Sequence, residues 1–289
     1  MINIIKNTVT EKERKKKMAT KTTEKTPDSS RILGNEKRNK VPFAVVEAYK
    51  TTRIHIVSTL EKSNSKIFAI SSPNAAEGKS TTAINVAIAL SQLNKKVLII
   101  DADSRRSTIH KKLKTENGLG LLDIISGTAT IEECVRDYNN NMKFLTSGTQ
   151  ANNPSELYST DSFSEFLDNV KDMFDYIIFD TPPINLVSDA LVIAQKCDGI
   201  ILVARANITT YDAFKRTVDS TKELNINVFG VIINGYESEK SYKYGKYSRY
   251  GKYGYGRYSG YGRYGYYRYR NSYYSRPSHN SDSKNDNNN

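Results

Sequence analysis

The sequence feature that most constrains how this chain can fold is residues 69–82, which read AISSPNAAEGKSTT. An apolar run at 67–70 leads into the stretch, and a helical pattern from Ala83 to Leu93 follows it. A strand, a tight loop and a helix start form the context of a phosphate-binding loop, because the backbone N–H groups of the loop and of the first helical turn point at phosphate oxygens. The stretch therefore predicts such a loop.

Two side chains of this loop suit a nucleoside triphosphate with Mg²⁺. The Lys79 ammonium is expected to reach the β- and γ-phosphates, and the Ser80 hydroxyl is expected to ligate Mg²⁺. Pro73 stands at the first Gly position of the pattern G-x-x-x-x-G-K-[ST], so a plain helix cap is the alternative reading. The residues predicted to bind ATP are Ala75, Ala76, Glu77, Gly78, Lys79, Ser80 and Thr81.

Positive charge is concentrated at the two ends of the chain. The 289 residues carry a net charge of +12, with 12 Lys and Arg against 5 Asp and Glu in residues 1–40, and 11 against 4 in residues 236–289. Each end therefore carries +7, and the middle carries −2. We predict a disordered basic arm at 1–40, one globular domain at 41–235 and a disordered tail at 236–289.

The tail is rich in tyrosine: 15 of the 20 tyrosines lie at or after Tyr236, interleaved with Gly, Ser, Lys and Arg. No aliphatic residue occurs there, so the segment cannot build a core. Stacking of Tyr and Arg on the bases of a nucleic acid is one function that such a composition permits.

Composition argues against secretion and against a membrane span. Only Cys134 and Cys197 are present, without metal-binding spacing, which is typical of reduced thiols. No apolar segment follows the basic N-terminus, and runs such as 199–204 are too short to span a bilayer. We expect a soluble, cytoplasmic protein.

Apolar runs that alternate with helical patterns predict an α/β fold with a mostly parallel sheet covered by helices on both faces. The predicted strands are Lys66–Ser72, Lys96–Asp101, Met142–Thr146, Asp175–Asp180, Gly199–Ala204 and Val228–Ile233. The predicted helices, besides the one after the loop, are Pro42–Leu60, Ser104–Leu113, Gly118–Ser126, Ser162–Met173, Val187–Gln195 and Thr209–Leu224.

Three carboxylates follow predicted parallel strands: Asp101, Asp103 and Asp180. Because ligands of such sheets sit outside the carboxyl ends of the strands, these groups are expected to converge on Lys79 and Ser80. Asp180 suits the Mg²⁺ shell, while Asp101 and Asp103 offer one metal contact and one base for a hydroxyl proton. Singly, each Asp could instead be a turn or helix-cap residue. Asn234, at the end of the last strand, could contact adenine or be a turn residue.

The first predicted helix carries Glu47, Lys50 and Arg53 on one flank. Their spacing of three permits either a contact with a neighbouring subunit or pairing within the helix.

Three segments resemble the Walker A, A′ and B motifs of the bacterial tyrosine kinases that accompany capsule and exopolysaccharide synthesis: residues 77–82, residues 97–106 and residues 179–183. The likeness extends to residues 153–157, 188–190 and 198–205, and to the tyrosine-rich tail. It implies a P-loop NTPase fold and catalysis by Lys79, Asp101, Asp103 and Asp180, with Mg²⁺ held by Ser80, Asp101 and Asp180. Two positions depart from the family pattern, because Ala76 replaces a usual Gly and Lys50 replaces a usual Arg.

The resemblance also implies that ATP phosphorylates tail tyrosines between subunits of a ring, through contacts of Glu47, Lys50 and Arg53. Further expectations are a transmembrane adaptor that recruits the kinase to the inner face of the membrane, a cognate tyrosine phosphatase, polysaccharide-synthesis enzymes as substrates, and no nucleic-acid partner. The expected acceptors are Tyr242, Tyr244, Tyr247, Tyr250, Tyr253, Tyr255, Tyr258, Tyr261, Tyr264, Tyr266, Tyr267, Tyr269, Tyr273 and Tyr274.

Two other functions remain open at this point. Positioning ATPases with a deviant Walker motif share much of this pattern, but they carry a signature Lys where this chain has Asn74. A nucleic-acid-binding protein would explain the tail and would leave the nucleotide motifs without a role.

Overall fold

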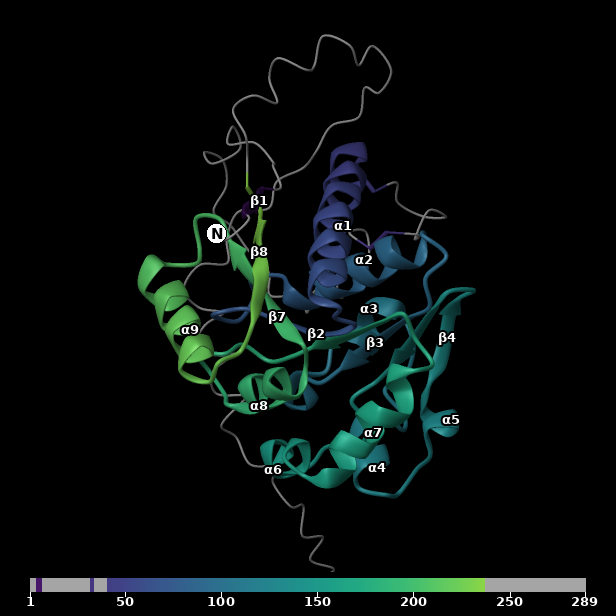
Figure 1. The fold of residues 1–289 in the computed structure, drawn as a ribbon. Coiled ribbons are helices and arrows are strands. Elements are labelled where there is room, and N and C mark those ends of the chain that lie inside the picture. The colour runs from purple at the N-terminus through teal and green to yellow at the C-terminus, as the bar shows by residue number, and fades with distance from the viewer. Residues whose placement is uncertain (1–3, 7–31, 34–40, 237–289) are drawn as a thin grey trace, which may run out of the picture.

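The computed structural model describes residues 4–6, 32, 33 and 41–236. These residues contain an eight-stranded sheet of order β1-β8-β7-β2-β6-β3-β5-β4 (Figure 1). The strands are β1 (Ile4–Lys6), β2 (Ile67–Ser71), β3 (Val97–Asp101), β4 (Arg136–Asn139), β5 (Met142–Leu145), β6 (Tyr176–Asp180), β7 (Gly199–Arg205) and β8 (Val228–Asn234). All neighbours are parallel except the antiparallel pair β4 and β5.

Helices cover both faces of this sheet, which confirms the predicted fold class (Figure 1). One face packs against α1 (Phe43–Ser63), α2 (Lys79–Ser91) and α3 (Ile109–Leu113). The other packs against α4 (Leu121–Ile125), α6 (Pro154–Tyr158), α7 (Asp161–Lys171), α8 (Asp189–Lys196) and α9 (Tyr211–Glu223), with the short α5 (Ile131–Cys134) beside them. The central strands are apolar on both sides because both faces are buried.

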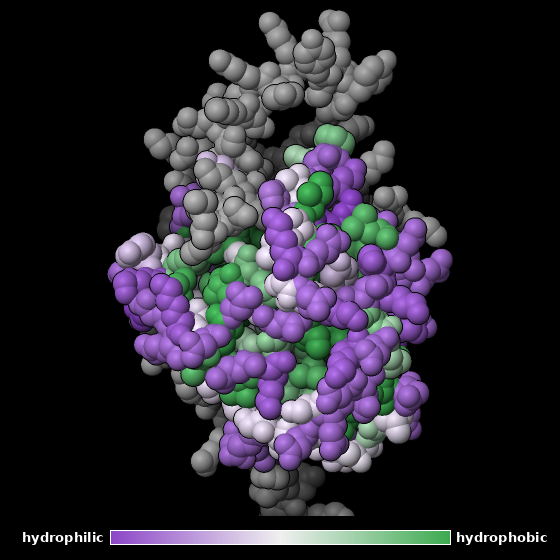
Figure 2. Space-filling model, in the orientation of Figure 1, coloured by the Kyte–Doolittle hydropathy of each residue, from purple (hydrophilic) through white to green (hydrophobic). Residues whose placement is uncertain are grey.

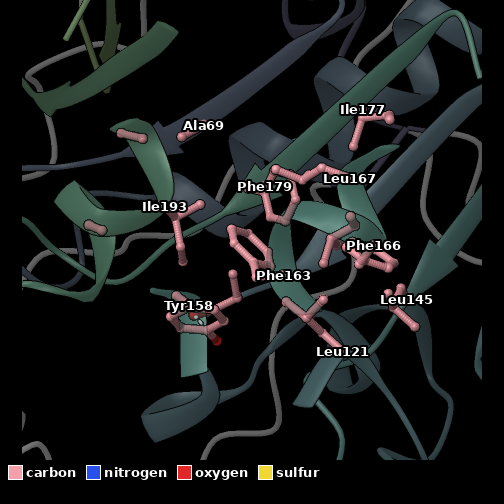
Figure 3. Close-up of a cluster of buried hydrophobic side chains, with 14 of the residues drawn as sticks. Ala69, Leu121, Leu145, Tyr158, Phe163, Phe166, Leu167, Ile177, Phe179 and Ile193 are labelled. Atoms are coloured by element: carbon pink, nitrogen blue, oxygen red, sulfur yellow. Dashed lines mark hydrogen bonds between the residues drawn. The ribbon is translucent and has the colours of Figure 1, made fainter. Parts of the chain in front are cut away.

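An aromatic cluster fixes the helices of the second face. The Phe163 ring of α7 meets the Phe179 ring of β6 edge-on, with ring centroids 5.9 Å apart, and the Tyr158 ring of α6 at 5.5 Å (Figure 3). All three side chains are fully buried. Because Phe179 directly precedes Asp180, this packing helps to hold the end of β6 in place.

The six predicted strands are all present, with ends shifted by one residue at most. The prediction of one helix over Ser104–Leu113 is wrong, because a 3-10 turn at Ser104–Arg106 and α3 are separated by Ser107 and Thr108, whose backbone is not helical. The Asp103 carboxylate accepts the Arg106 N–H and so caps the start of the turn, while the Asp101 carboxylate accepts the Thr108 and Ile109 N–H groups at the start of α3. Strand β4 and helices α5 and α6 were not predicted.

Five residues of the segment 1–40, which is predicted to be a disordered arm, are among the described residues. Ile4–Lys6 pairs with β8 as strand β1, and Ile32 and Leu33 are buried against the first face. The Leu33 N–H donates to the buried Asn85 of α2. The other residues of the arm, and the predicted tail from residue 237 on, lie outside the described residues.

On the face shown in Figure 2, the described residues are mainly hydrophilic, with smaller hydrophobic areas between the polar side chains. Exposed apolar side chains include Phe43 and Ile54 of α1. None of the helices in the described part of the chain combines the length and the apolar character that a membrane crossing requires.

Candidate active site

The predicted phosphate-binding loop connects β2 to α2, as its sequence indicates. Gly78, just before α2, has φ +96°, and a Cβ atom on it would come within 2.5 Å of Asn234 Nδ2. Both the conformation and the space therefore require Gly here. The Asn234 amide donates to Glu77 O at 3.0 Å and to Thr82 Oγ1 at 3.1 Å, so this side chain ties the end of β8 to the loop. A role of Asn234 toward adenine stays a prediction.

The end of β7 and the residues that follow it also contact the phosphate-binding loop. Glu77 is buried and accepts hydrogen bonds from Asn74 N at 3.0 Å and from Thr209 Oγ1 at 2.7 Å. Burial raises the pKa of Glu77 above its ordinary value. Arg205 Nη1 donates to Ala76 O at 3.0 Å. Ala76 itself has φ +64°, a left-handed conformation that is strained for Ala and that Gly would adopt without strain.

Lys79 lies between two carboxylates at the carboxyl edge of the sheet. Its Nζ atom is 2.9 Å from Asp103 Oδ2, 3.7 Å from Asp180 Oδ1 and 3.3 Å from Ser80 Oγ. The Lys79 side chain is 6% exposed and both carboxylates are fully buried. The structure thus confirms that these predicted site residues converge, while their catalytic roles stay a prediction.

Asp180 is suited to a cation. Neither of its buried carboxylate oxygens has a hydrogen-bond partner within the described residues. Burial raises the pKa of Asp180, and the Lys79 ammonium opposes this rise. Oxygens without hydrogen bonds beside the Ser80 hydroxyl fit Mg²⁺, which prefers oxygen ligands. Since the described residues contain no group of three or more His, Cys, Asp or Glu that could hold a metal, phosphates and water would have to complete its shell.

Asp101 anchors helix α3. Its Oδ2 atom accepts hydrogen bonds from Ser107 Oγ at 2.7 Å, Thr108 N at 2.9 Å and Ile109 N at 3.0 Å. Burial, and then the nearby Asp180 carboxylate, raise the pKa of Asp101 to about 7. The helix-cap alternative therefore describes the contacts of Asp101 well, and its predicted metal and catalytic roles are untested. Asp103 instead directs one oxygen at Lys79 and accepts from Arg106 N with the other.

Two further segments of the family pattern meet the A′ motif. Arg105 Nε donates to the buried Asp189 of α8 at 2.9 Å, and Ser155 of α6 donates to the same carboxylate. Tyr158 OH donates to Ala102 O at 3.3 Å. The sequence did not predict these contacts. In the structure, Tyr158 holds the backbone at Ala102, before Asp103, and Asp189 holds the Arg105 side chain, after Asp103.

The three charged residues of α1 divide into a pair and a single residue. Lys50 Nζ is 2.8 Å from Glu47 Oε1, so pairing within the helix is present. Arg53 Nη1 donates to Ala89 O of α2 at 2.8 Å. A contact of these residues with another subunit stays a prediction.

Comparison with known proteins identifies the family. A family model described as "AAA domain" matches residues 65–227. "Tyrosine-protein kinase YwqD" of Bacillus subtilis is 35% identical over 202 residues, which cover 70% of this chain and 85% of that protein. The chain belongs to the bacterial tyrosine-protein kinases. "Tyrosine-protein kinase CpsD" of Streptococcus agalactiae is 36% identical over 189 residues and is covered to 82%. An EpsB protein of Ralstonia solanacearum, 30% identical, is much longer, and the chain spans only 28% of it.

Solved structures agree with this assignment. The chimerical protein CapA2B2 has a TM-score of 0.67 and 27% identity, over 74% of this chain and 92% of that one. The tyrosine kinase domain of BceF has a TM-score of 0.61 and 26% identity, over 66% and 78% of the two chains. The family assignment favours the predicted tyrosine kinase over the positioning ATPases and the nucleic-acid-binding protein.

The contacts of the two A′ carboxylates predict different consequences for their loss. Asp103→Asn should lower the rate of tyrosine phosphorylation at least about a hundredfold, because it removes the carboxylate that faces Lys79, while nucleotide binding survives better. Asp101→Asn should lower the rate at least about tenfold and also lower the melting temperature, because α3 loses its anchor. Initial rates and thermal unfolding of both variants measure this. Rates like those of the wild type in both would mean that the carboxylates only shape a turn.

Proposed function

We propose that this tyrosine kinase transfers the γ-phosphoryl group of MgATP to tyrosines of the C-terminal tail of a neighbouring subunit, and so regulates capsule or exopolysaccharide synthesis. The observation that carries the proposal is the Lys79 ammonium, held between Asp103 and Asp180 at the end of a phosphate-binding loop. A cation, a metal-binding carboxylate and a second carboxylate at one sheet edge are the groups that phosphoryl transfer requires.

The residues divide the chemistry among them. Backbone N–H groups at the start of α2 and the Lys79 ammonium bind the phosphates, while Ser80 and Asp180 would hold Mg²⁺, which neutralises developing charge when bound. Asp103 accepts the proton of the tyrosine hydroxyl, because its Oδ2 atom faces Lys79 whereas the Oδ2 of Asp101 is engaged with α3. A bond forms from the tyrosine oxygen to the γ-phosphorus, the bond to the β–γ bridging oxygen breaks, and ADP leaves.

The resemblance to the family supports the rest of the proposal. The proposal also includes a ring of subunits with contacts at Glu47, Lys50 and Arg53. It further includes a transmembrane adaptor that recruits the kinase to the inner face of the membrane, and a cognate tyrosine phosphatase. Polysaccharide-synthesis enzymes are the proposed external substrates. Phosphorylation adds about −1.5 to −2 charge per tyrosine, so a few events would reverse the net charge of +7 that residues 236–289 carry.

Deletion of residues 236–289 tests the acceptor. The truncated chain should keep its melting temperature and its ATP affinity and lose most tyrosine self-phosphorylation, because 15 of the 20 tyrosines go with the tail. Phosphotyrosine detection and peptide mapping measure this outcome.

The tyrosines of the folded domain provide the control. Tyr49, Tyr158 and Tyr176 are buried, whereas Tyr211 is 77% exposed. A Tyr211→Phe variant with an intact tail should therefore label like the wild type. Labelling that survives the deletion and disappears with Tyr211→Phe would show that the tail is not the main acceptor.

A further inference from the structure

Helix α3 directs a second lysine at the nucleotide loop. Lys112 Nζ donates a hydrogen bond of 2.9 Å to Thr81 Oγ1, and Thr81 directly follows Ser80. Thr81 lies in the first turn of α2, and α3 follows Asp101 and Asp103 in the chain. The hydrogen bond therefore joins the A′ segment to the start of α2. Lys112 is only partly exposed, whereas the neighbouring Lys111 on the same short helix is exposed.

The position of Lys112 is fixed by buried groups. Asp101 accepts the N–H groups of Thr108 and Ile109, and Ile109 is fully buried against the first face of the sheet. Lys112 N then donates to Thr108 O at 3.1 Å, one turn after this anchor. A lysine placed in this way loses less freedom on binding a ligand than a lysine on an unanchored surface.

The surroundings of the loop favour a second cation. The Lys79 ammonium already faces the buried carboxylates of Asp103 and Asp180, so a second ammonium would help to balance the charge of a bound polyphosphate. The Thr81 hydroxyl accepts from Lys112, which leaves its own proton to donate to an anion.

We propose that Lys112 is a second phosphate-binding lysine, whose ammonium contacts a phosphate oxygen of the bound nucleoside triphosphate beside Thr81. The inference rests on the proposed use of ATP and adds a binding residue that the Walker motifs do not contain.

Two neighbouring lysines provide a matched test. Lys112→Met should raise the KM for MgATP at least about tenfold and change kcat less, because a charge-assisted hydrogen bond to the nucleotide is lost in ground state and transition state alike. Lys111→Met removes the same charge from the exposed side of the helix and should leave KM within about twofold. Lys112→Arg should recover most of the affinity, because it keeps the positive charge.

MgATP affinity is also measured directly, by calorimetric titration of the full chain at two salt concentrations. The salt dependence of binding should be smaller for Lys112→Met than for Lys111→Met. Melting temperatures verify that each variant is folded, and Lys112→Gln replaces Lys112→Met if the latter is not. Equal KM and affinity in the Lys111 and Lys112 variants of an active kinase would overturn the inference, whereas a wild-type chain that neither binds ATP nor phosphorylates tyrosine would overturn the proposed function itself.

Discussion

Lys79→Met is expected to abolish ATP-dependent tyrosine phosphorylation, with a loss of at least about a thousandfold, as for removal of a preorganised group that stabilises transition-state charge. The Lys79 ammonium is nearly inaccessible to solvent and faces both Asp103 and Asp180. Met has a similar length but no charge, so it neither binds the γ-phosphate nor balances these carboxylates. Incubation with radiolabelled ATP, followed by detection of phosphotyrosine, measures the effect.

The fold should survive this substitution with a lower melting temperature, because two buried carboxylates lose their cation. The matched control is Lys95→Met, which removes a half-exposed lysine 3.8 Å from Asp175 at the other end of the sheet. That variant should label like the wild type, since exposed ion pairs contribute little. Unchanged labelling in a folded Lys79→Met variant would show that the active site lies elsewhere.

The sequence was sufficient to predict the sheet and the convergence of the site, for a physical reason. Strands that are buried on both faces are continuous apolar runs, so β3 and β6 were recognisable, and each ends at an Asp. Parallel strands bring their carboxyl ends to one edge, so the positions of Asp101 and Asp180 in the chain also placed them at the edge of the sheet where Lys79 lies.

The remaining features depend on contacts between distant residues, which periodicity does not report. The break between Ser104 and Leu113 arises because the Asp101 carboxylate accepts the N–H groups of Thr108 and Ile109, which a continuous helix would use within itself. The amide of Asn234 contacts the loop across an interval of 152 to 157 residues. Strand β1 is too short to be recognised from its own sequence and exists through its pairing with β8.

Lys112 is a residue of the site whose contact could not be predicted from the sequence. Its sequence context, a run of basic residues after the A′ motif, looks like a solvated helix face. Only the helix start set by Asp101 turns this one lysine toward Thr81. Spacing alone could not distinguish it from Lys111.

The proposed transfer between subunits predicts a second large effect. A Lys79→Met chain with an intact tail is inactive alone, but it should become labelled on tyrosine when it is mixed with an active chain that lacks residues 236–289. The only working site then belongs to another molecule, and the only tail belongs to the inactive one. In the proposed oligomer the acceptor tyrosines are tethered close to the neighbouring site, which gives them a high effective concentration, so labelling should approach that of the wild type. Peptide mapping should place the phosphates among Tyr242 to Tyr274.

Subunit contact can be removed from this mixture without touching the nucleotide site. Alanine at Glu47, Lys50 and Arg53 of both chains should shift the mass in light scattering from oligomer to monomer and reduce labelling of the inactive chain. Because Arg53 also bonds α2 within its own subunit, the double variant at Glu47 and Lys50 separates loss of the interface from loss of internal packing. Transfer between subunits would be wrong if the inactive chain stayed unlabelled while light scattering showed that the two chains form mixed oligomers.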